Sequence, residues 1–166
     1  MNPIDIRDLL AQPGASRTEH VHEPVPGLRL GLAAVPEDAP VSGDLLFEHV
    51  VEGVLVSGPL RGKLMVSCAR CLREFEKPFS VEVRELFSQG AEPEDDEYPI
   101  SAEGTVDVEP MIRDAVLLAI PFSPLCRPDC LGLCERCGGD RNLGECTCPP
   151  EAADPRWAAL DRLFQL

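Results

Sequence analysis

The chain of 166 residues is long enough for one domain of ordinary size, and too short for two unless the second is held by something other than a hydrophobic core. Hydrophobic residues make up 44% and charged residues 27%, which excludes a disordered chain. The formal net charge of −14 argues against a simple nucleic-acid binder, because affinity for phosphates comes mainly from Lys and Arg.

The first half of the chain is predicted to consist mainly of strands. Residues 2–10 (NPIDIRDLL) are the exception and are typical of a short helix, with Asn2 as the cap and Pro3 at the first helical position. Residues 16–35 alternate weakly and are interrupted by proline, which indicates one or two irregular strands. An antiparallel meander is predicted from the Val- and Leu-rich segments 44–50, 53–57 and 63–66, and the alternating segment 79–84 extends this sheet to about residue 87.

The second half changes character after an acidic run. Residues 92–109 hold eight acidic residues and no basic one, which is typical of a solvated loop, and 105–108 can form a short strand within it. Residues 109–120 predict a helix with a broad apolar face, which Pro121 ends. Residues 121–153 lack periodicity but hold six of the eight cysteines.

A last helix is predicted over residues 154–166. Trp157, Leu160, Leu163 and Phe164 share one face of it, and this face needs a partner. The grouping of strands before one strong helix predicts an α+β fold: an antiparallel sheet or open barrel with a packed helix and a cysteine-rich, zinc-binding C-terminal tail. We predict three parts: an α+β core domain (1–120), a cysteine-rich zinc-binding segment (121–153) and a C-terminal amphipathic helix (154–166).

The predicted location follows from what the sequence lacks. No apolar stretch is long enough to cross a membrane, and the N-terminal residues MNPIDIRDLL lack the features of a signal peptide. A cytoplasmic protein without a membrane partner is therefore expected. Because cytoplasmic thiols are kept reduced, the eight cysteines indicate metal or thiol chemistry and not a disulfide framework.

The cysteines form four short pairs, the usual building blocks of structural zinc sites. They are Cys68/Cys71, Cys126/Cys130, Cys134/Cys137 and Cys146/Cys148, which match two Zn²⁺ ions in number. Spacing alone leaves the pairing open. The preferred partition joins Cys68 and Cys71 to Cys126 and Cys130, and makes the last four cysteines a local site, because this closes the tail most economically.

A redox or catalytic role for the cysteines is the alternative to zinc binding. The Cys68/Cys71 motif can serve as a thiol redox centre or a redox sensor, but a thioredoxin-like dithiol belongs at a helix start in a βαβ setting, and here it follows a strand. The sequence contains neither a phosphate-binding GxxxxGK[ST] motif nor a GxSxG motif. The prediction is a protein that is not an enzyme.

One segment departs from the acidic balance of the chain. Between Arg61 and Arg84 there are six basic residues against three acidic ones, and they are candidate RNA contacts: Arg61, Lys63, Arg70, Arg73, Lys77 and Arg84. For the arginines near the cysteines, electrostatic stabilisation of thiolates is an equally good interpretation.

Three stretches together resemble a known family. They are CARCLREFEKPFSVEV, the run from DVEPMIRDAVLLAIPFSPLC to CTC, and DPRWAALDRLFQL, and in this order they look like the YceD family. The resemblance covers roughly residues 45–166. It implies a role in ribosome biogenesis through the accumulation of large-subunit ribosomal RNA, with no established catalytic residues. The partner is then expected to be ribosomal RNA or a basic large-subunit ribosomal protein, which the acidic chain would shield.

Overall fold

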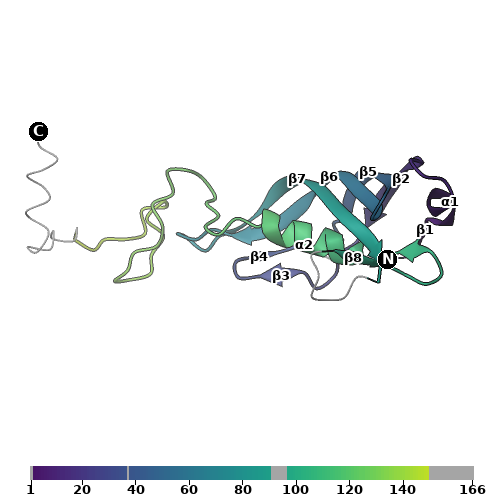
Figure 1. Ribbon diagram of the computed structural model, residues 1–166. Helices are drawn as coiled ribbons and strands as arrows, with labels where there is room; N and C mark the ends of the chain where they lie inside the picture. Colours follow the sequence, from purple (N-terminus) through teal and green to yellow (C-terminus); the bar gives the residue numbers. More distant parts are fainter. Residues whose placement is uncertain (1, 37, 91–96, 150–166) are drawn as a thin grey trace, which may run out of the picture.

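The computed structural model describes residues 2–36, 38–90 and 97–149, which form one long sheet-rich body followed by an irregular tail (Figure 1). Within these residues nine strands make a single sheet, and seven of them follow the order β1-β9-β8-β7-β6-β4-β3. The other two form a branch: β5 pairs with a part of β6 that β4 leaves free, and β2 pairs with β5. Their bounds are β1 Ile4–Asp5, β2 Ser16–Glu23, β3 Arg29–Leu30, β4 Ala33–Ala34, β5 Val41–Val50, β6 Gly53–Ser67, β7 Glu74–Gln89, β8 Tyr98–Ile100 and β9 Thr105–Val106.

The long hairpin of β6 and β7 is the backbone of the fold. The two strands pair without interruption from Val54 opposite Phe87 to Ser67 opposite Glu74. Alternate residues of β6 are buried, as a strand with one face on the core requires: Val54, Val56, Leu60, Leu64 and Val66. The turn of this hairpin therefore projects a cysteine pair away from the core.

The prediction of two separate strands at 53–57 and 63–66 is wrong, because β6 runs through both. Pro59 lacks a backbone N–H, but it lies where the register between β5 and β6 is interrupted, so no bond of that ladder is lost. Gly58 has φ +149°, and a Cβ there would lie 2.4 Å from the carbonyl oxygen of Asp44. Glycine thus lets the two strands approach closely where the sequence suggested a turn.

Helix α2, Glu109–Ala119, agrees closely with the predicted 109–120. It buries Met111, Ile112 and Val116 and packs against β7. Its C-cap residue, Ile120, is already extended (φ −68°, ψ 123°), as the following Pro121 requires. The helix lies across the sheet and leads directly to the cysteine-rich tail (Figure 1).

The described fold is dominated by the sheet, so the α+β expectation is met only in part. Helix α1, Arg7–Leu10, has four residues, and β1 occupies Ile4–Asp5, so a helix over residues 2–10 is wrong. The N–H of Ile6 bonds to the carbonyl of Gly104, which holds the preceding residues against β9. Antiparallel pairing prevails, but β7 and β8 are parallel. The helix predicted for 154–166 lies outside the described residues, whose helices include none suited to spanning a membrane.

The buried apolar residues of the described chain form two separate clusters. The larger one fills the space among the strands, α1 and α2 and contains the fully buried Phe47, Phe87 and Ile112. The smaller one consists of Cys68, Cys71 and Cys130, with Phe75 and Leu125 among the residues packed on it. The tail is therefore joined to the sheet through cysteines instead of through an extension of the main core.

Candidate metal centre

The tip of the β6–β7 hairpin presents the first cysteine pair. Cys68 follows the last residue of β6, and Cys71 comes three residues before β7 begins. The chain leaving α2 supplies Cys126 and Cys130, and the N–H of Ala69 bonds to the carbonyl of Pro124 at 2.7 Å. These four cysteines are the inner quartet, and all but Cys126 are buried.

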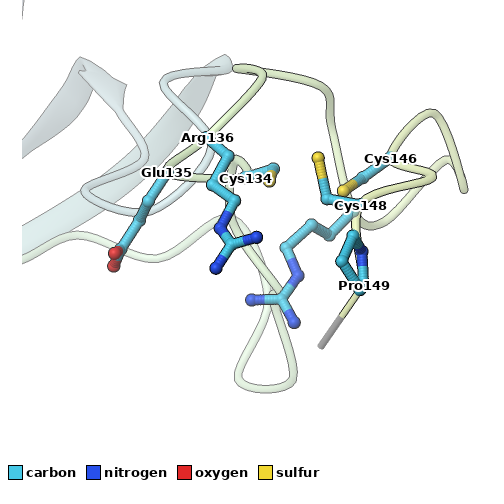
Figure 2. A pocket seen from close by; sticks show the side chains of 7 residues that line it. Cys134, Glu135, Arg136, Cys146, Cys148 and Pro149 are labelled. Carbon is cyan, nitrogen blue, oxygen red and sulfur yellow. The ribbon is translucent and has the colours of Figure 1, made fainter. Parts of the chain in front are cut away.

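The remaining four cysteines form a second group in the tail, the outer quartet: Cys134, Cys137, Cys146 and Cys148. Figure 2 shows the sulfurs of Cys134, Cys146 and Cys148 turned toward one region, beside a hollow of about 120 Å³. The side chains of Glu135 and Arg136 point away from these sulfurs in the same view. Cys137 is exposed, so the outer quartet is the more accessible one.

The first pair of each quartet lies on a turn of the same shape. In the inner turn, the N–H of Leu72 bonds to the carbonyl of Cys68 and the N–H of Cys68 bonds to the carbonyl of Arg73, both at 2.9 Å. In the outer turn, the N–H of Gly138 bonds to the carbonyl of Cys134 at 2.8 Å, and the N–H of Cys134 bonds to the carbonyl of Gly139 at 2.9 Å. The fifth residue of each turn has positive φ, 59° at Leu72 and 71° at Gly138.

The sulfur positions suit a tetrahedral ion. Within each quartet all four sulfurs lie within 4.8 Å of one another. The Sγ atoms of Cys68 and Cys130 are 3.8 Å apart, and those of Cys71 and Cys126 are 3.7 Å apart. Four sulfurs at about 2.3 Å from zinc lie roughly 3.8 Å from each other, so these two pairs of the inner quartet already have the spacing of zinc ligands.

The pKa values of two cysteines in the inner quartet are shifted in opposite directions, which indicates where the positive charge of a cation would matter. Burial acts to raise the pKa of Cys68, but backbone N–H groups, among them those of Cys126, Cys71 and Arg70, stabilise its thiolate and lower the pKa to about 6. Burial and the neighbouring thiols raise the pKa of Cys126 to about 12. One thiolate is therefore stabilised by the fold, while further ionisation among closely packed sulfurs requires a positive charge between them.

In the outer quartet, too, the pKa of one cysteine is lowered and that of another is raised. The backbone N–H of Cys137 and the side chain of Cys146 are the main groups that lower the pKa of Cys134 to about 6. The side chains of Cys137 and Cys146 raise the pKa of Cys148 to about 12. Both quartets thus combine one stabilised thiolate with one thiol that resists ionisation, as expected of sulfurs gathered for a shared cation.

Polar contacts join the two quartets. The N–H of Leu133 bonds to the carbonyl of Arg70 at 3.0 Å, and the guanidinium of Arg70 donates to the carbonyl of Cys130 at 2.8 Å. The amide of Asn142 donates to the sulfur of Cys130 at 3.5 Å, so a residue of the outer loop supports a ligand of the inner quartet. Asp140 accepts two bonds from Asn142 and pairs with Arg73 at 3.6 Å.

The grouping of the cysteines agrees with the preferred partition, which put Cys68 and Cys71 with Cys126 and Cys130. That these eight residues bind metal stays a prediction. The side chains of two arginines near the inner sulfurs bind oxygen atoms, and the electrostatic stabilisation of thiolates by the arginines stays a prediction. The guanidinium of Arg70 donates to the carbonyl of Cys130 and Arg73 pairs with Asp140, whereas the inner sulfurs accept hydrogen bonds from the backbone N–H of Arg70 and from the amide of Asn142.

The six basic residues proposed to contact RNA are not gathered on one surface. Arg61, Lys63 and Arg84 lie on the face of the hairpin opposite the buried side chains, whereas Lys77 pairs with the buried Leu64 and so lies on the other face. Arg70 and Arg73 lie at the tip. Lys63 is already paired with Glu76 at 3.1 Å. A continuous basic stripe is therefore absent from this segment.

Sequence reasoning missed Asn142 and Leu72. Asn142 accepts bonds from Leu131 and Arg127 as well as donating to Cys130, and only its place in a cysteine-rich loop hinted at such a role. Leu72 has a backbone conformation that favours glycine. Its position after CARC, parallel to Gly138 after CERC, was the available signal.

Comparison with known proteins places this arrangement in a family. Residues 56–164 match the family model described as large ribosomal RNA subunit accumulation protein YceD. The matched region includes the whole of both quartets and α2. No solved structure matches the chain.

Individual relatives extend the match over almost the whole chain. An uncharacterised protein of Mycobacterium tuberculosis is 39% identical over 171 aligned positions, which cover 95% of this chain and 78% of the relative. The YlbN protein of Bacillus subtilis is 28% identical and covers 64% of this chain and 63% of its own length. A maize protein named large ribosomal RNA subunit accumulation protein YCED homolog 1, chloroplastic, is 39% identical over 51 residues, 30% of this chain and 17% of the maize protein.

Proposed function

Because the chain belongs to the YceD family of large ribosomal RNA subunit accumulation proteins, we propose that it is a ribosome biogenesis factor. It supports the accumulation of large-subunit ribosomal RNA in the cytoplasm. The observation that carries this proposal is the family match over residues 56–164, which includes most of the β6–β7 hairpin, α2 and both quartets. The part that the family shares is thus the part that we propose to be organised by metal.

Each quartet binds one Zn²⁺ ion in this proposal. Four cysteines per group and sulfur spacings of 3.7 and 3.8 Å in the inner quartet support closed tetrahedral sites. A closed site has no free position for water or substrate, so these ions stabilise structure. The tail buries few apolar residues, and zinc binding replaces the core that it lacks.

The protein acts as a non-catalytic adaptor in this proposal, and the redox alternative has less support. A reactive dithiol needs an accessible thiolate, whereas Cys68 is fully buried and Cys71 is only 7% exposed. Each of them also lies within 4 Å of a sulfur from the tail, Cys130 and Cys126 respectively. An attacking thiol would have to leave this packed group first.

We favour a basic large-subunit ribosomal protein over RNA as the direct partner. The net charge of −14 opposes phosphate binding and suits a cationic protein. The hairpin does not offset this, because its basic residues lie on two faces and two of them, Lys63 and Arg73, are paired with acidic residues of the chain. Shielding of such a protein before its assembly would be consistent with a loss of ribosomal RNA when the factor is missing.

The biological role is tested by deleting the gene and measuring the ratio of large-subunit to small-subunit ribosomal RNA. We expect the ratio to fall, to recover with the wild-type gene, and to stay low with a Cys68→Ser/Cys130→Ser variant. A matched control is Val51→Ser, at a fully exposed apolar residue distant in sequence from the cysteines. An unchanged ratio in the deletion strain would refute the proposed role.

The partner is tested in vitro with the zinc-loaded protein. We expect it to retain basic large-subunit ribosomal proteins in a pull-down and to release them as salt rises, since charge drives the contact. Gel-shift assays with large-subunit RNA fragments should show no binding at the same salt. Tight RNA binding without capture of a ribosomal protein would reverse the choice of partner and leave the biogenesis role intact.

A further inference from the structure

An apolar groove lies between the end of α2 and the β3–β4 hairpin. It encloses about 520 Å³ and is lined by Leu30, Gly31, Leu32, Leu117, Leu118, Ile120, Pro121 and Phe122. Neither quartet contributes to it. The groove therefore calls for an explanation separate from the metal sites.

The side chains around this groove are unusually exposed. Leu118 is 86% exposed and Phe122 is completely exposed, and Leu30 and Leu32 also lie open to solvent. Single exposed apolar residues are common, but four large ones around one hollow mark a binding surface. Since α2 directs Met111, Ile112 and Val116 into the core, Leu118 belongs to a second apolar face that no described element covers.

The chain itself offers a segment of matching chemistry. Residues 154–166, outside the described part, predict a helix with Trp157, Leu160, Leu163 and Phe164 on one face. A helix this short is marginal alone and needs an apolar surface to form. Two aromatic and two aliphatic side chains complement a groove lined almost wholly by apolar groups.

We propose that residues 154–166 of one copy bind the groove of a second copy, and that the exchange is reciprocal. The described chain ends at Pro149, at the far end of the tail from α2 (Figure 1). The chain from Pro149 to Trp157 spans at most about 29 Å when fully extended, and it would have to return past both quartets to reach its own groove. A second copy removes this constraint, and the interface is isologous, as in most dimers.

Trp157 makes the proposal directly measurable, because it is the single tryptophan of the chain. We would record its emission and the molar mass of the full zinc-loaded protein by light scattering along a dilution series. We expect a dimer with blue-shifted, quencher-protected emission, and a joint change to monomer and water-exposed emission on dilution. Phe122→Asp should weaken the dimer at least about 100-fold, since each dimer loses two copies of the contact.

Val51→Asp is the matched control, because Val51 is as exposed as Phe122 but does not line the groove. It should leave both mass and emission unchanged. Three results would overturn the proposal: a monomer with protected tryptophan, which would place the segment in its own groove; a dimer insensitive to Phe122→Asp, which would place the interface elsewhere; and a tryptophan exposed to solvent at every concentration.

Discussion

Leu72 and Gly138 occupy the same place in two turns with the same hydrogen bonds, yet one is glycine and the other is not. Both have positive φ, which costs a side-chain-bearing residue about 1–2 kcal/mol. The Leu72 side chain is 58% exposed, so packing within the described chain recovers little of this cost. Strained residues of this kind persist where the surroundings fix the backbone, and here the hydrogen bonds from Leu72 to Cys68 and from Cys68 to Arg73 close the turn around it.

Exchanging these two residue types tests the equivalence of the turns. Gly138→Leu should lower the free energy of unfolding of the zinc-loaded protein by about 1–2 kcal/mol, because a Cβ at this position meets no atom within 4 Å and the backbone strain is then the main cost. Leu72→Gly should cause no loss. Chemical denaturation of both variants measures this, and a large destabilisation by Leu72→Gly would show that its side chain contributes contacts of its own.

Asn142 is predicted to tune the inner quartet from outside. Its amide donates to the sulfur of Cys130, and its carbonyl oxygen accepts from the N–H of Leu131 at 2.8 Å. Asn142→Asp replaces the donor with an anion beside a thiolate and should weaken zinc binding at the inner quartet about 10–100-fold. Chelator competition measures the affinity. Leu143→Asp, at an exposed neighbour, is the control, and equal losses in both variants would disprove a specific role for the amide.

At the scale of elements, α2 separates the residues that hold the fold from those that form the groove. Ile112 is fully buried against the sheet, and Ile112→Ala should cost about 2–5 kcal/mol. Leu118 is 86% exposed on the same helix, and Leu118→Ala should change the stability of the protein at low concentration by less than about 0.5 kcal/mol. Urea denaturation compares them, and similar losses would mean that Leu118 is packed in solution.

The elements with strong local signals were predictable from the sequence. The apolar face of residues 109–120 and the stop at Pro121 fixed α2 to within one residue. The continuity of β6 was not predictable. The residue types of Gly58, Pro59 and Gly62 are typical of a turn, but their pairing with β7 keeps them in the strand. The prediction of a helix over residues 2–10 was wrong for the same reason. The pairing of Ile4 and Asp5 with β9 outweighs the helix propensity of so short a segment.

The candidate site was predictable as a set of cysteines but not as a network. Pair spacing and the short path from α2 to Cys126 pointed to the grouping that the structure shows. Two hydrogen bonds connect the quartets. One joins Leu133 to Arg70, which are far apart in the sequence, and the other joins Asn142 to Cys130, which lie in irregular loops. No periodic pattern encodes contacts of that kind.

On the scale of the whole molecule, the inner quartet is the joint between sheet and tail. Cys68 and Cys71 come from the hairpin, whereas Cys126 and Cys130 come from the chain after α2. The outer quartet draws all four cysteines from the tail. Loss of the inner ion should therefore release the tail from the sheet, whereas loss of the outer ion should loosen only the tail beyond Leu133.

Hydrogen exchange on Cys68→Ser and Cys148→Ser measures this difference. Cys68→Ser should reduce protection at both the hairpin tip and residues 121–130, and Cys148→Ser should leave those two regions protected. Identical exchange patterns in the two variants would mean that the quartets fold as one unit, because the hydrogen bonds between them would then outweigh their separate ions.

Native mass spectrometry of the full chain tests the central claim most directly, since it counts the ions bound to each folded molecule. Protein purified without added metal should carry two zinc ions, and Cys68→Ser and Cys148→Ser should each carry one. A wild-type protein that keeps its folded charge distribution with no metal, or with its cysteines oxidised in pairs, would contradict the account of two zinc-binding quartets.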